Sequence, residues 1–315
     1  MVKQVFIDGE AGTTGLQVRD RLANRKDLNL LSIDPADRKD PEARRKLLNS
    51  ADAVVLCLPD AAAREAAAMV ENPAVKIIDA STAHRVDPDW VYGLAEMHAD
   101  QRERLATATR IANPGCYPTG FILLVRPLID AGVLPEDSRL NMHAISGYSG
   151  GGKQLIEVFD NDAEPYAAYG LNLNHKHIPE MQRYTALQHA PIFCPSIADY
   201  PQGMIDMVPV HLDLLAAGTK AADLQAILAA RYAGEAFVRV LPMNSDEILT
   251  RGAFLRPDRL LDTNNLEIIV YANDARRQAL LVACYDNLGK GASGAAVQNL
   301  NIALGLDETK GVNLG

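Results

Sequence analysis

The sequence predicts an α/β protein with a Rossmann-like parallel-sheet domain and a second, α+β domain that contains a mixed sheet. Strand and helix patterns alternate over the first 80 residues, which is typical of a parallel sheet with helices on both faces. Near the C-terminus, two β-rich runs at 266–271 and 279–285 flank a short polar connection, which predicts a hairpin. A chain of 315 residues with 48% hydrophobic and 23% charged residues suits two globular domains.

The first part of the chain supplies the alternation. Strands are expected at 2–8, 28–34, 53–58 and 75–79, and helices at 12–24, 41–50 and 60–70. Asp60 is the expected N-cap of the last helix. The continuous apolar run at 53–58 is typical of a parallel strand that is buried on both faces.

The later part shows a different mixture of elements. It predicts helices at 117–129, 224–232 and 293–304, a strand at 139–146 and a flexible glycine loop at 147–152. Ser293 is the expected N-cap of the C-terminal helix, whose Val297, Leu300 and Leu304 share one face. This mixture suits an α+β domain with a partly antiparallel sheet.

Charge and cysteine usage narrow the function classes. The formal net charge of −9 disfavours non-specific nucleic-acid binding. Cys57, Cys116, Cys194 and Cys284 lie far apart without a CxxC pair, which argues against a disulfide framework or a zinc ribbon. The sequence shows no signal peptide and no apolar run of membrane-spanning length. We therefore expect a cytoplasmic protein without a metal, nucleic-acid or membrane partner.

A glycine loop follows the first expected strand. Gly9, Gly12 and Gly15 are spaced G-x-x-G-x-x-G and precede the first expected helix. Glycines at this place allow a tight turn and a close backbone approach to a pyrophosphate, which the helix N-terminus attracts. The loop predicts a dinucleotide site, with a tight turn that binds no ligand as the alternative.

Two kinds of side chain follow the second expected strand, where dinucleotide specificity is usually set. Asp34 would accept hydrogen bonds from ribose hydroxyls and would repel a 2′-phosphate. Ser32, Arg38 and Lys39 lie close by in sequence and could bind that phosphate, although a solvated loop is an equal alternative. The choice between NAD and NADP stays open at this point.

Cys116 is the strongest candidate nucleophile. It lies in the stretch NPGCYPTG at 113–120, where Pro114 and Gly115 indicate a turn and Pro118 suits the first turn of a helix. A helix N-terminus stabilises a thiolate and lowers the pKa of a cysteine, and its free N–H groups can stabilise an oxyanion. A small buried residue in a turn is the alternative. The other three cysteines are expected to be packing residues.

His175 and His177 are the best proton partners for this thiol. Together with Glu180 they form the segment HKHIPE, in which a carboxylate could orient or tune an imidazole. Metal ligation is a rival interpretation, but zinc needs three or four ligands and no second cluster matches. A surface loop is the remaining alternative.

Seven motifs, in order along nearly the whole chain, give it a resemblance to the short-form N-acetyl-γ-glutamyl-phosphate reductases of the aspartate-semialdehyde dehydrogenase superfamily. They are GEAGTTG (9–15), DASTAHR (79–85), YGLAE (92–96), NPGCYPTG (113–120), SGYSGGGK (146–153), HKHIPE (175–180) and GKGASGAAVQNLN (289–301).

The resemblance implies both an organisation and a reaction. Residues 1–115 plus 290–315 would form the dinucleotide-binding domain, and residues 116–289 the catalytic and oligomerisation domain. The enzyme would use NADP(H) to reduce N-acetyl-γ-glutamyl phosphate to N-acetyl-L-glutamate 5-semialdehyde through a cysteine thioester, in arginine biosynthesis. It would assemble as a homodimer or a homotetramer.

The resemblance also assigns residues to roles. Cys116 matches the nucleophile, and His177 is favoured over His175 as the acid/base, with Glu180 beside them. The cofactor residues would be Gly9, Ala11, Gly12, Thr13, Thr14, Gly15, Asp34, Arg38 and Ser81. The substrate residues would be Ser81, Arg85, Asn113, Ser146 and Gly147. Lys153 and Glu96 also lie in matching motifs, and each has a structural alternative.

The chain departs from the commoner family pattern at one place. An acidic residue and an aromatic residue usually precede the arginine of the second motif, where this chain has Ala83 and His84. Two rival functions remain open. One is a sister enzyme that acts on aspartyl or aminoadipyl phosphate. The other is a dinucleotide-binding redox sensor in which Cys116 is oxidised.

Overall fold

The computed structural model describes residues 2–38, 40–162 and 164–313. The chain divides into two compact units, of which the first comprises Met1–Pro114 and Ala292–Gly315 and the second Gly115–Gly291. In the described part of the chain, no helix is long and apolar enough to cross a membrane.

The first unit contains a six-stranded parallel sheet. Its strands are β1 (Lys3–Asp8), β2 (Leu28–Leu31), β3 (Ala53–Leu56), β4 (Lys76–Asp79), β5 (Val91–Tyr92) and β6 (Arg110–Ala112). The order is β2-β1-β3-β4-β6-β5, and all five pairings are parallel. The predicted Rossmann-like parallel sheet is therefore confirmed.

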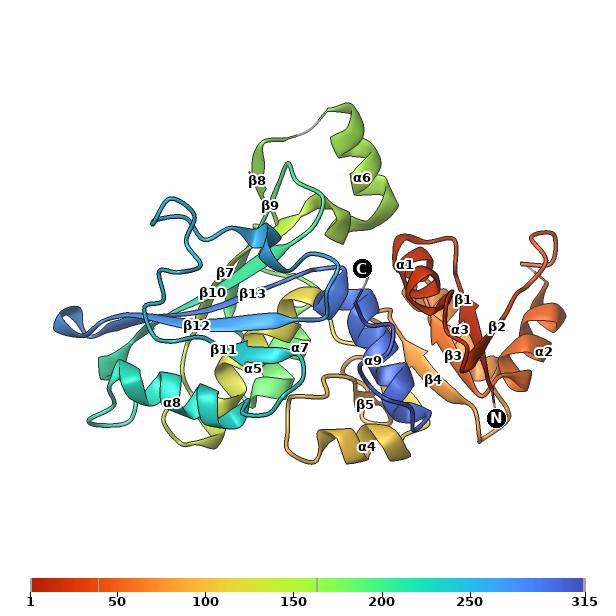
Figure 1. Ribbon diagram of the computed structural model, residues 1–315, viewed down its shortest axis with the longest axis horizontal. Coiled ribbons are helices and arrows are strands. Elements are labelled where there is room, and N and C mark those ends of the chain that lie inside the picture. The colour runs from red at the N-terminus through yellow and green to blue at the C-terminus, as the bar shows by residue number, and fades with distance from the viewer. Residues whose placement is uncertain (1, 39, 163, 314–315) are drawn as a thin grey trace. The chain divides into compact units, whose positions relative to one another are not determined.

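Helices cover this sheet. They are α1 (Thr13–Leu22), α2 (Pro41–Ser50), α3 (Asp60–Met69), α4 (Gln101–Thr107) and the C-terminal α9 (Gly294–Ala303). α9 packs on α1, α4, β3 and β4, so the chain's last helix lies in the N-terminal unit (Figure 1). Leu48 of α2 and Ala66 of α3 belong to one buried cluster with Phe6, Val54 and Ile77 of the strands.

The second unit contains a seven-stranded mixed sheet. Its strands are β7 (Asn141–Gly147), β8 (Tyr166–Ala168), β9 (Ile192–Ala198), β10 (Met204–His211), β11 (Val238–Val240), β12 (Leu266–Asn273) and β13 (Gln278–Tyr285). The order is β11-β12-β13-β10-β7-β9-β8. β12 and β13 form the predicted antiparallel hairpin, whereas β7 and β9 are parallel. The predicted mixed sheet is therefore confirmed.

The helices α5 (Cys116–Asp130), α7 (Ile178–Thr185) and α8 (Ala221–Arg231) pack together beside this sheet (Figure 1). α5 contacts β10 and β13, and α8 contacts β12. A separate buried cluster joins Ile205, Ile269 and Val282 of the strands to Ile248 and Leu255 from the segment before β12. The sheet thus supports α5, which carries the candidate nucleophile.

Two local predictions differ from the structure, and a third is confirmed in position only. The expected glycine loop at 147–152 is a 3₁₀-helix (Tyr148–Gly151) that leads into α6 (Gly152–Asn161). Asp60 is the first residue of α3 and not its N-cap, because its carboxylate instead accepts hydrogen bonds from the N–H and hydroxyl of Thr82. Ser293 occupies the N-cap position of α9 but makes no capping bond, because its hydroxyl contacts Arg21 and Gln17.

Candidate active site

Cys116 is the first residue of α5. Gly115 is the N-cap and has an extended backbone conformation, and no side chain caps the helix. Cys116 is itself partly exposed, whereas almost all of the residues that follow it in the helix are buried. The unsatisfied N–H groups of a first helical turn stabilise a thiolate or an oxyanion. The second unit therefore places a thiol where nucleophilic chemistry is favoured.

The two candidate histidines lie beside the residue that follows Cys116. The ring of Tyr117 is 6.1 Å from that of His175 and 5.9 Å from that of His177, measured between centroids. The two imidazoles are 4.7 Å apart. The predicted cluster of histidines is thus adjacent to the start of α5.

The two imidazoles differ in their surroundings. His175 Nδ1 accepts a hydrogen bond from the backbone N–H of His177 at 3.2 Å. Partial burial, followed by the charge of Lys176, lowers the pKa of His175 to about 4. His175 is therefore neutral near pH 7. His177 is 5% exposed and is the N-cap residue of α7.

Glu180 contacts the nucleophile's loop directly. It lies in the first turn of α7, is 1% exposed and accepts a hydrogen bond from the Gly115 N–H at 3.0 Å through Oε2. A buried carboxylate thus holds the backbone one residue before Cys116. Its expected effect on an imidazole stays a prediction.

The sequence analysis missed three residues of the second unit that support Cys116, either directly or through one another. Tyr285 of β13 donates a hydrogen bond to the Cys116 carbonyl at 2.7 Å and lies 2.5 Å from Asp206 Oδ2 of β10. A Cβ on Gly291 would lie 2.9 Å from that of Cys116, so this position must be small. The GKG motif, which contains Gly291, was the only sequence signal for these three residues. All three are distant from Cys116 along the chain, so no local pattern links them to it.

Ser146 and Gly147 end β7 in the same unit. Ser146 is buried, and its hydroxyl donates to the carbonyl of Gly147 at 3.1 Å. A Cβ on Gly147 would lie 2.5 Å from the Pro201 carbonyl oxygen, so close backbone packing requires glycine there. Their expected contact with substrate stays a prediction.

The glycine loop of the first unit joins β1 to α1. Gly9 has a φ of +90°, and a Cβ there would lie 2.3 Å from the Cys57 carbonyl oxygen. A Cβ on Gly15 would lie 2.4 Å from the Gly9 carbonyl oxygen. Internal packing therefore accounts for these two glycines.

Gly12 is different. It is exposed, its φ is ordinary, and a Cβ there would be 3.5 Å from its nearest neighbour, the Gly9 carbonyl oxygen. Gly12 is also the N-cap of α1, and its helix N-terminus has no side-chain cap. Since packing does not require glycine here, the bare helix N-terminus fits the close approach of a pyrophosphate. Ala11, Thr13 and Thr14 flank this position.

A pocket of about 190 Å³ lies next to the glycine loop, and Gly9, Ala11 and Arg38 line it. Arg38 donates to Glu10 Oε1 at 3.2 Å, and Lys39 lies outside the described residues. Asp34 accepts the N–H of Ala36 at 2.9 Å and so stabilises its own turn. Arg38, the described basic candidate for ribose recognition, therefore lies next to the glycine loop.

The DASTAHR motif forms a buried network at the end of β4. Asp79 Oδ2 accepts the Ser81 hydroxyl at 2.8 Å and lies 2.6 Å from His84 Nδ1. The His84 ring stacks on Trp90 with centroids 4.0 Å apart. Arg85 is buried and donates to the Ala80 carbonyl at 3.3 Å. The unusual His84 thus stiffens the loop that carries Ser81 and Arg85.

Asn113 and Glu96 make internal contacts in the first unit. The Asn113 amide donates to the Ala292 carbonyl at 3.0 Å and accepts from Asn299 at 2.9 Å. Glu96 is fully buried and accepts from Gln298 at 2.9 Å. These bonds attach the β6 end and the YGLAE segment to α9. The expected substrate contact of Asn113 stays a prediction.

Comparisons with known proteins agree with both units. Residues 4–105 match the family description "Semialdehyde dehydrogenase, NAD binding domain", and residues 116–287 match "Semialdehyde dehydrogenase, dimerisation domain". The chain belongs to the semialdehyde dehydrogenase family. Within it, the chain is 51% identical to the N-acetyl-gamma-glutamyl-phosphate reductase of Burkholderia cenocepacia, over 96% of this chain and 97% of the relative. It is 48% identical to N-acetyl-gamma-glutamyl-phosphate reductase 2 of a Nostoc species, over 98% and 99%.

Solved structures of the semialdehyde dehydrogenase family share this fold. Aspartate semialdehyde dehydrogenase II of Vibrio cholerae matches with a TM-score of 0.73 over 96% of this chain and 98% of its own, at 15% identity. The aspartate semialdehyde dehydrogenase of Candida albicans, whose structure holds NADP, matches with a TM-score of 0.60 over 99% and 100%, at 14% identity. At such low identity these likenesses show the fold alone.

The remaining cysteines differ from Cys116. Burial raises the pKa of Cys57 and of Cys284 to about 12 in each case, so both thiols stay protonated near neutral pH. Cys194 lies on β9 and is partly exposed. In the described part of the chain, no group of three or more histidine, cysteine or acidic side chains could hold a metal ion.

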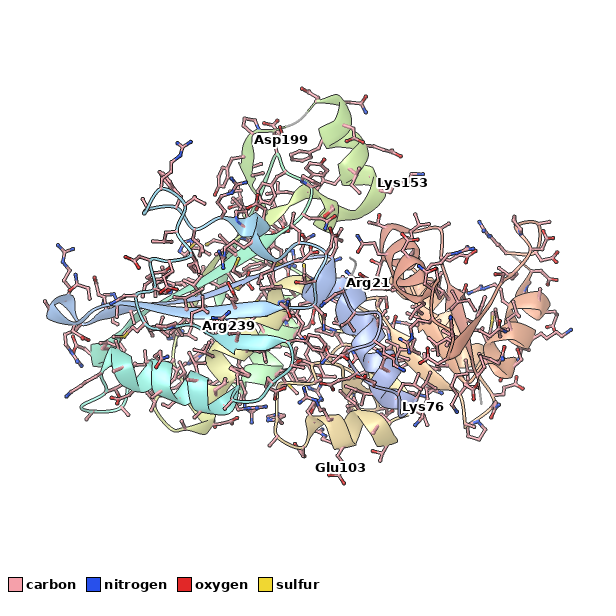
Figure 2. All side chains as sticks on the ribbon, in the orientation of Figure 1. Arg21, Lys76, Glu103, Lys153, Asp199 and Arg239 are labelled. Atoms are coloured by element: carbon pink, nitrogen blue, oxygen red, sulfur yellow. The ribbon has the colours of Figure 1, made fainter. Side chains whose placement is uncertain are left out.

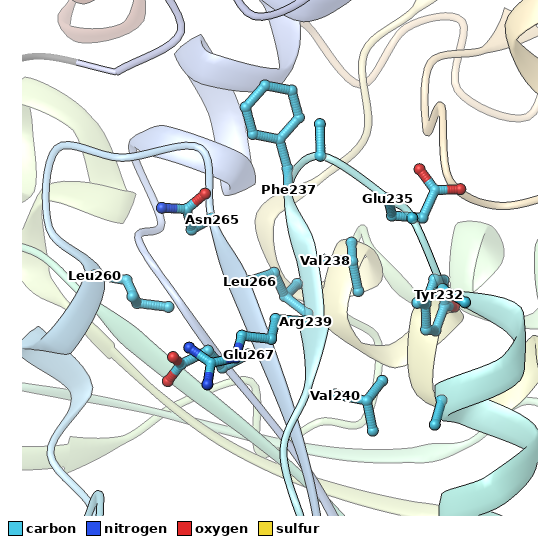
Figure 3. Close-up of a pocket in the computed structure, with 14 residues that line it drawn as sticks. Tyr232, Glu235, Phe237, Val238, Arg239, Val240, Leu260, Asn265, Leu266 and Glu267 are labelled. Carbon is cyan, nitrogen blue, oxygen red and sulfur yellow. The ribbon is translucent and has the colours of Figure 1, made fainter.

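Two further features of the second unit stand apart from the predicted site. Lys153 is exposed on α6 (Figure 2). A pocket of about 480 Å³ lies beside the edge strand β11, and Tyr232, Phe237 and Arg239 line it (Figure 3). None of the predicted site residues lines this pocket, so it adds nothing to the proposed chemistry.

Proposed function

We propose that the chain catalyses the NADPH-dependent reduction of N-acetyl-γ-glutamyl phosphate to N-acetyl-L-glutamate 5-semialdehyde, a step of arginine biosynthesis. Relatives that are 48% and 51% identical over nearly the whole chain are named N-acetyl-gamma-glutamyl-phosphate reductases, after this reaction. The observation that carries the chemistry is Cys116 at the uncapped start of α5. Residues 1–115 plus 290–315 would bind the dinucleotide, and residues 116–289 would supply catalysis and the subunit interface.

The first step is acylation of the thiol. The Cys116 thiolate attacks the acyl carbon, and the carbonyl electrons move onto oxygen. The N–H groups of the first turn of α5 suit the resulting oxyanion. As the oxyanion collapses, the C–O bond to phosphate breaks, and a thioester and free phosphate remain. Arg85, whose guanidinium can make bidentate contacts, is proposed to bind the phosphate.

The second step reduces the thioester. When bound, NADPH supplies the hydride for this reduction. The thiohemiacetal oxygen then gives up its electrons to re-form a carbonyl, the C–S bond breaks, and aldehyde and thiolate separate. We propose that His177 provides and removes the proton at oxygen. His175 is the weaker candidate because its lowered pKa keeps it neutral at physiological pH.

The glycine loop fits a dinucleotide, because exposed Gly12 leaves the α1 N-terminus open. Gly9, Ala11, Gly12, Thr13, Thr14 and Gly15 would hold the pyrophosphate. For the ribose end we propose Arg38, which favours NADP, with Asp34 as its acidic neighbour. Ser81 would contact the cofactor or substrate, and Asn113, Ser146 and Gly147 the substrate.

The partners follow from the same assignment. The second unit matches a dimerisation domain, and we propose a homodimer or a homotetramer that acts on a small acyl phosphate in the cytoplasm. Neither nucleic acid nor membrane has a role in this chemistry. Size-exclusion chromatography with light scattering will give the assembly size, and a monomer at working concentration would contradict it.

The test is the reverse reaction, followed as NADP reduction with N-acetylglutamate semialdehyde and phosphate. We expect phosphate-dependent turnover that Cys116→Ser abolishes while NADPH binding persists, because a serine hydroxyl stays protonated. Aspartate and aminoadipate semialdehydes serve as comparison substrates. Faster turnover of either would assign the sister reaction. Nucleotide binding without phosphate-dependent turnover would assign a redox sensor.

A further inference from the structure

A fully buried acid is connected to the backbone of the nucleophile through one tyrosine, and it has no role in the reaction as proposed. Asp206 is 0% exposed and is the third residue of β10. Its Oδ2 lies 2.5 Å from the Tyr285 hydroxyl, and its buried Oδ1 has no hydrogen-bond partner in the described part of the chain. An ionised carboxylate in such a place is strongly disfavoured.

The Tyr285 hydroxyl has three hydrogen-bonding neighbours. It lies 2.7 Å from the Cys116 carbonyl oxygen and 2.5 Å from Asp206 Oδ2, and it accepts the Gly120 N–H at 3.1 Å. Burial raises the pKa of Tyr285 well above its usual value, so the phenol carries its single proton. One proton must therefore serve two oxygen contacts.

The count of protons decides which group supplies the second. A carbonyl oxygen has no proton to give, so the Tyr285 proton is needed for the Cys116 carbonyl. The contact between Tyr285 and Asp206 then requires a proton from the carboxyl group. With an ionised Asp206, one of the two short O···O contacts would have no hydrogen. Only a protonated Asp206 completes all three hydrogen bonds.

The hydrogen bonds that run from Asp206 through Tyr285 to Cys116 form a bridge, and this bridge reaches the first turn of α5. In an α-helix the N–H of residue i bonds the carbonyl of residue i−4, and Gly120 and Cys116 are such a pair. The Tyr285 hydroxyl contacts both groups. A Cβ on Gly120 would lie 2.2 Å from Asp206 Oδ2, so glycine is needed to admit the acid. The first turn of the helix is thus attached to the sheet at the nucleophile's own carbonyl.

We infer that Asp206 is a neutral, protonated acid that acts through Tyr285 to position the backbone of Cys116. The inference rests on the proposed function for its catalytic meaning. A neutral acid supports the first turn of α5 without placing a negative charge near a thiolate, which a carboxylate would oppose.

The surroundings agree with a neutral acid. In the described part of the chain, the titratable groups on which Asp206 acts are Tyr117 of α5, Cys284 and Tyr285 of β13, and Tyr169 after β8. All of them are neutral or anionic types, and none could balance a carboxylate. Burial raises the pKa of Asp206 well above its usual value, despite the hydrogen bond from Tyr285.

The protonation state is tested by unfolding. Folding should take up about one proton at Asp206, because the carboxyl is neutral when folded and ionised when unfolded. Since the folded state holds more protons, stability falls as pH rises above the ordinary value for aspartate. Relative to Asp206→Asn, the unfolding equilibrium constant of the wild type should therefore rise about tenfold per pH unit between about pH 5 and about pH 7.

A matched surface variant controls this measurement. Asp199→Asn makes the same chemical change at an exposed site (Figure 2), and its ratio to wild type should not change with pH. A pH-independent ratio for Asp206→Asn as well would overturn the inference. Should the Asp206 variant not fold, the carboxylic-acid carbonyl band in the infrared spectrum of the wild type decides. Loss of that band near neutral pH would also overturn it.

The positioning role is tested at the thiol. The rate of alkylation at Cys116, measured site by site as a function of pH, should have the same midpoint in Asp206→Asn as in the wild type. The asparagine amide, like the protonated acid, donates to Tyr285. Removal of a charged neighbour would instead lower the midpoint by about 1 pH unit. Tyr285→Phe should lower kcat about tenfold with KM unchanged, and Asp206→Leu should match it, because both break the bridge.

These results separate two kinds of failure. An unchanged kcat in Tyr285→Phe would remove the positioning role. Absence of turnover with every semialdehyde would refute the proposed function, yet the unfolding and alkylation results would still decide the state of Asp206.

Discussion

Two glycines of the nucleotide loop should respond in opposite ways to the same methyl group. Gly12→Ala adds a Cβ whose nearest neighbour would be 3.5 Å away, which is ordinary contact. Gly15→Ala adds one only 2.4 Å from the Gly9 carbonyl oxygen and 2.7 Å from Glu10 Cα, which are backbone atoms that must move. The pair separates what the fold requires from what a ligand requires.

The magnitudes follow from these distances. Overpacking at position 15 should cost about 1–3 kcal/mol of unfolding free energy, offset in part by the better helix propensity of alanine. At position 12, an alanine N-cap costs about 1 kcal/mol of unfolding free energy. Alanine also lowers the conformational entropy of the unfolded chain, which stabilises the folded state by a similar amount. Gly12→Ala should therefore fold almost normally. Its methyl group should still weaken NADPH binding at least about tenfold, or ~1.4 kcal/mol, by obstructing the pyrophosphate.

The assay is urea unfolding together with fluorescence titration of NADPH, on both variants and the wild type. The account predicts near-normal stability with poor binding for Gly12→Ala, and reduced stability for Gly15→Ala. If Gly12→Ala binds NADPH as well as the wild type does, the α1 N-terminus is not the pyrophosphate site. If it instead unfolds as easily as Gly15→Ala, the packing argument is wrong.

The remaining predictions concern the second unit. Because the pKa of His175 is about 4, His175→Asn should leave the pH profile of kcat between about pH 5 and about pH 8 unchanged. His177→Asn should lower kcat throughout this pH range, since it removes the proposed proton donor, and a loss of kcat in His175→Asn alone would reverse the assignment. Glu180→Ala should lower kcat at least about tenfold, because it leaves the Gly115 N–H without its acceptor. Glu180→Gln keeps an oxygen there and should stay within about threefold, and equal loss in both variants would point to the charge instead.

Local patterns predicted part of the scaffold. The apolar run at 53–58 indicated a buried parallel strand because such strands are covered on both faces, and β3 lies inside the first sheet. Pro118 and the apolar residues after it located the start of α5 within one residue. Both signals arise from neighbours in sequence, so no tertiary information was needed.

The support of the nucleophile could not be predicted in this way. The Tyr285 hydroxyl reaches the Cys116 carbonyl across 169 residues of chain, and Glu180 reaches Gly115 across 65. Asp206 lies in a strand that also contains Pro209, and that proline weakened the strand pattern. These contacts exist only once the second unit has folded, so a single sequence gives no local sign of them.

The Asp60 prediction failed, and Ser293 holds the predicted N-cap position without a capping bond, for a related reason. Both residues stand at a helix start, where a cap is the favoured local use of a short polar side chain. Tertiary partners, Thr82 for the first and Arg21 for the second, take those oxygens instead. Long-range hydrogen bonds therefore replaced the local ones.

The central claim is a covalent acyl group on Cys116, and mass spectrometry tests it most directly. Wild-type protein mixed with N-acetyl-γ-glutamyl phosphate in the absence of NADPH, then quenched in acid, should carry an N-acetylglutamyl group on the peptide that contains Cys116. Addition of NADPH should discharge it, and Cys116→Ala should never carry it. Full turnover with that peptide unmodified at every quench time, or the acyl group on another residue, would contradict the account.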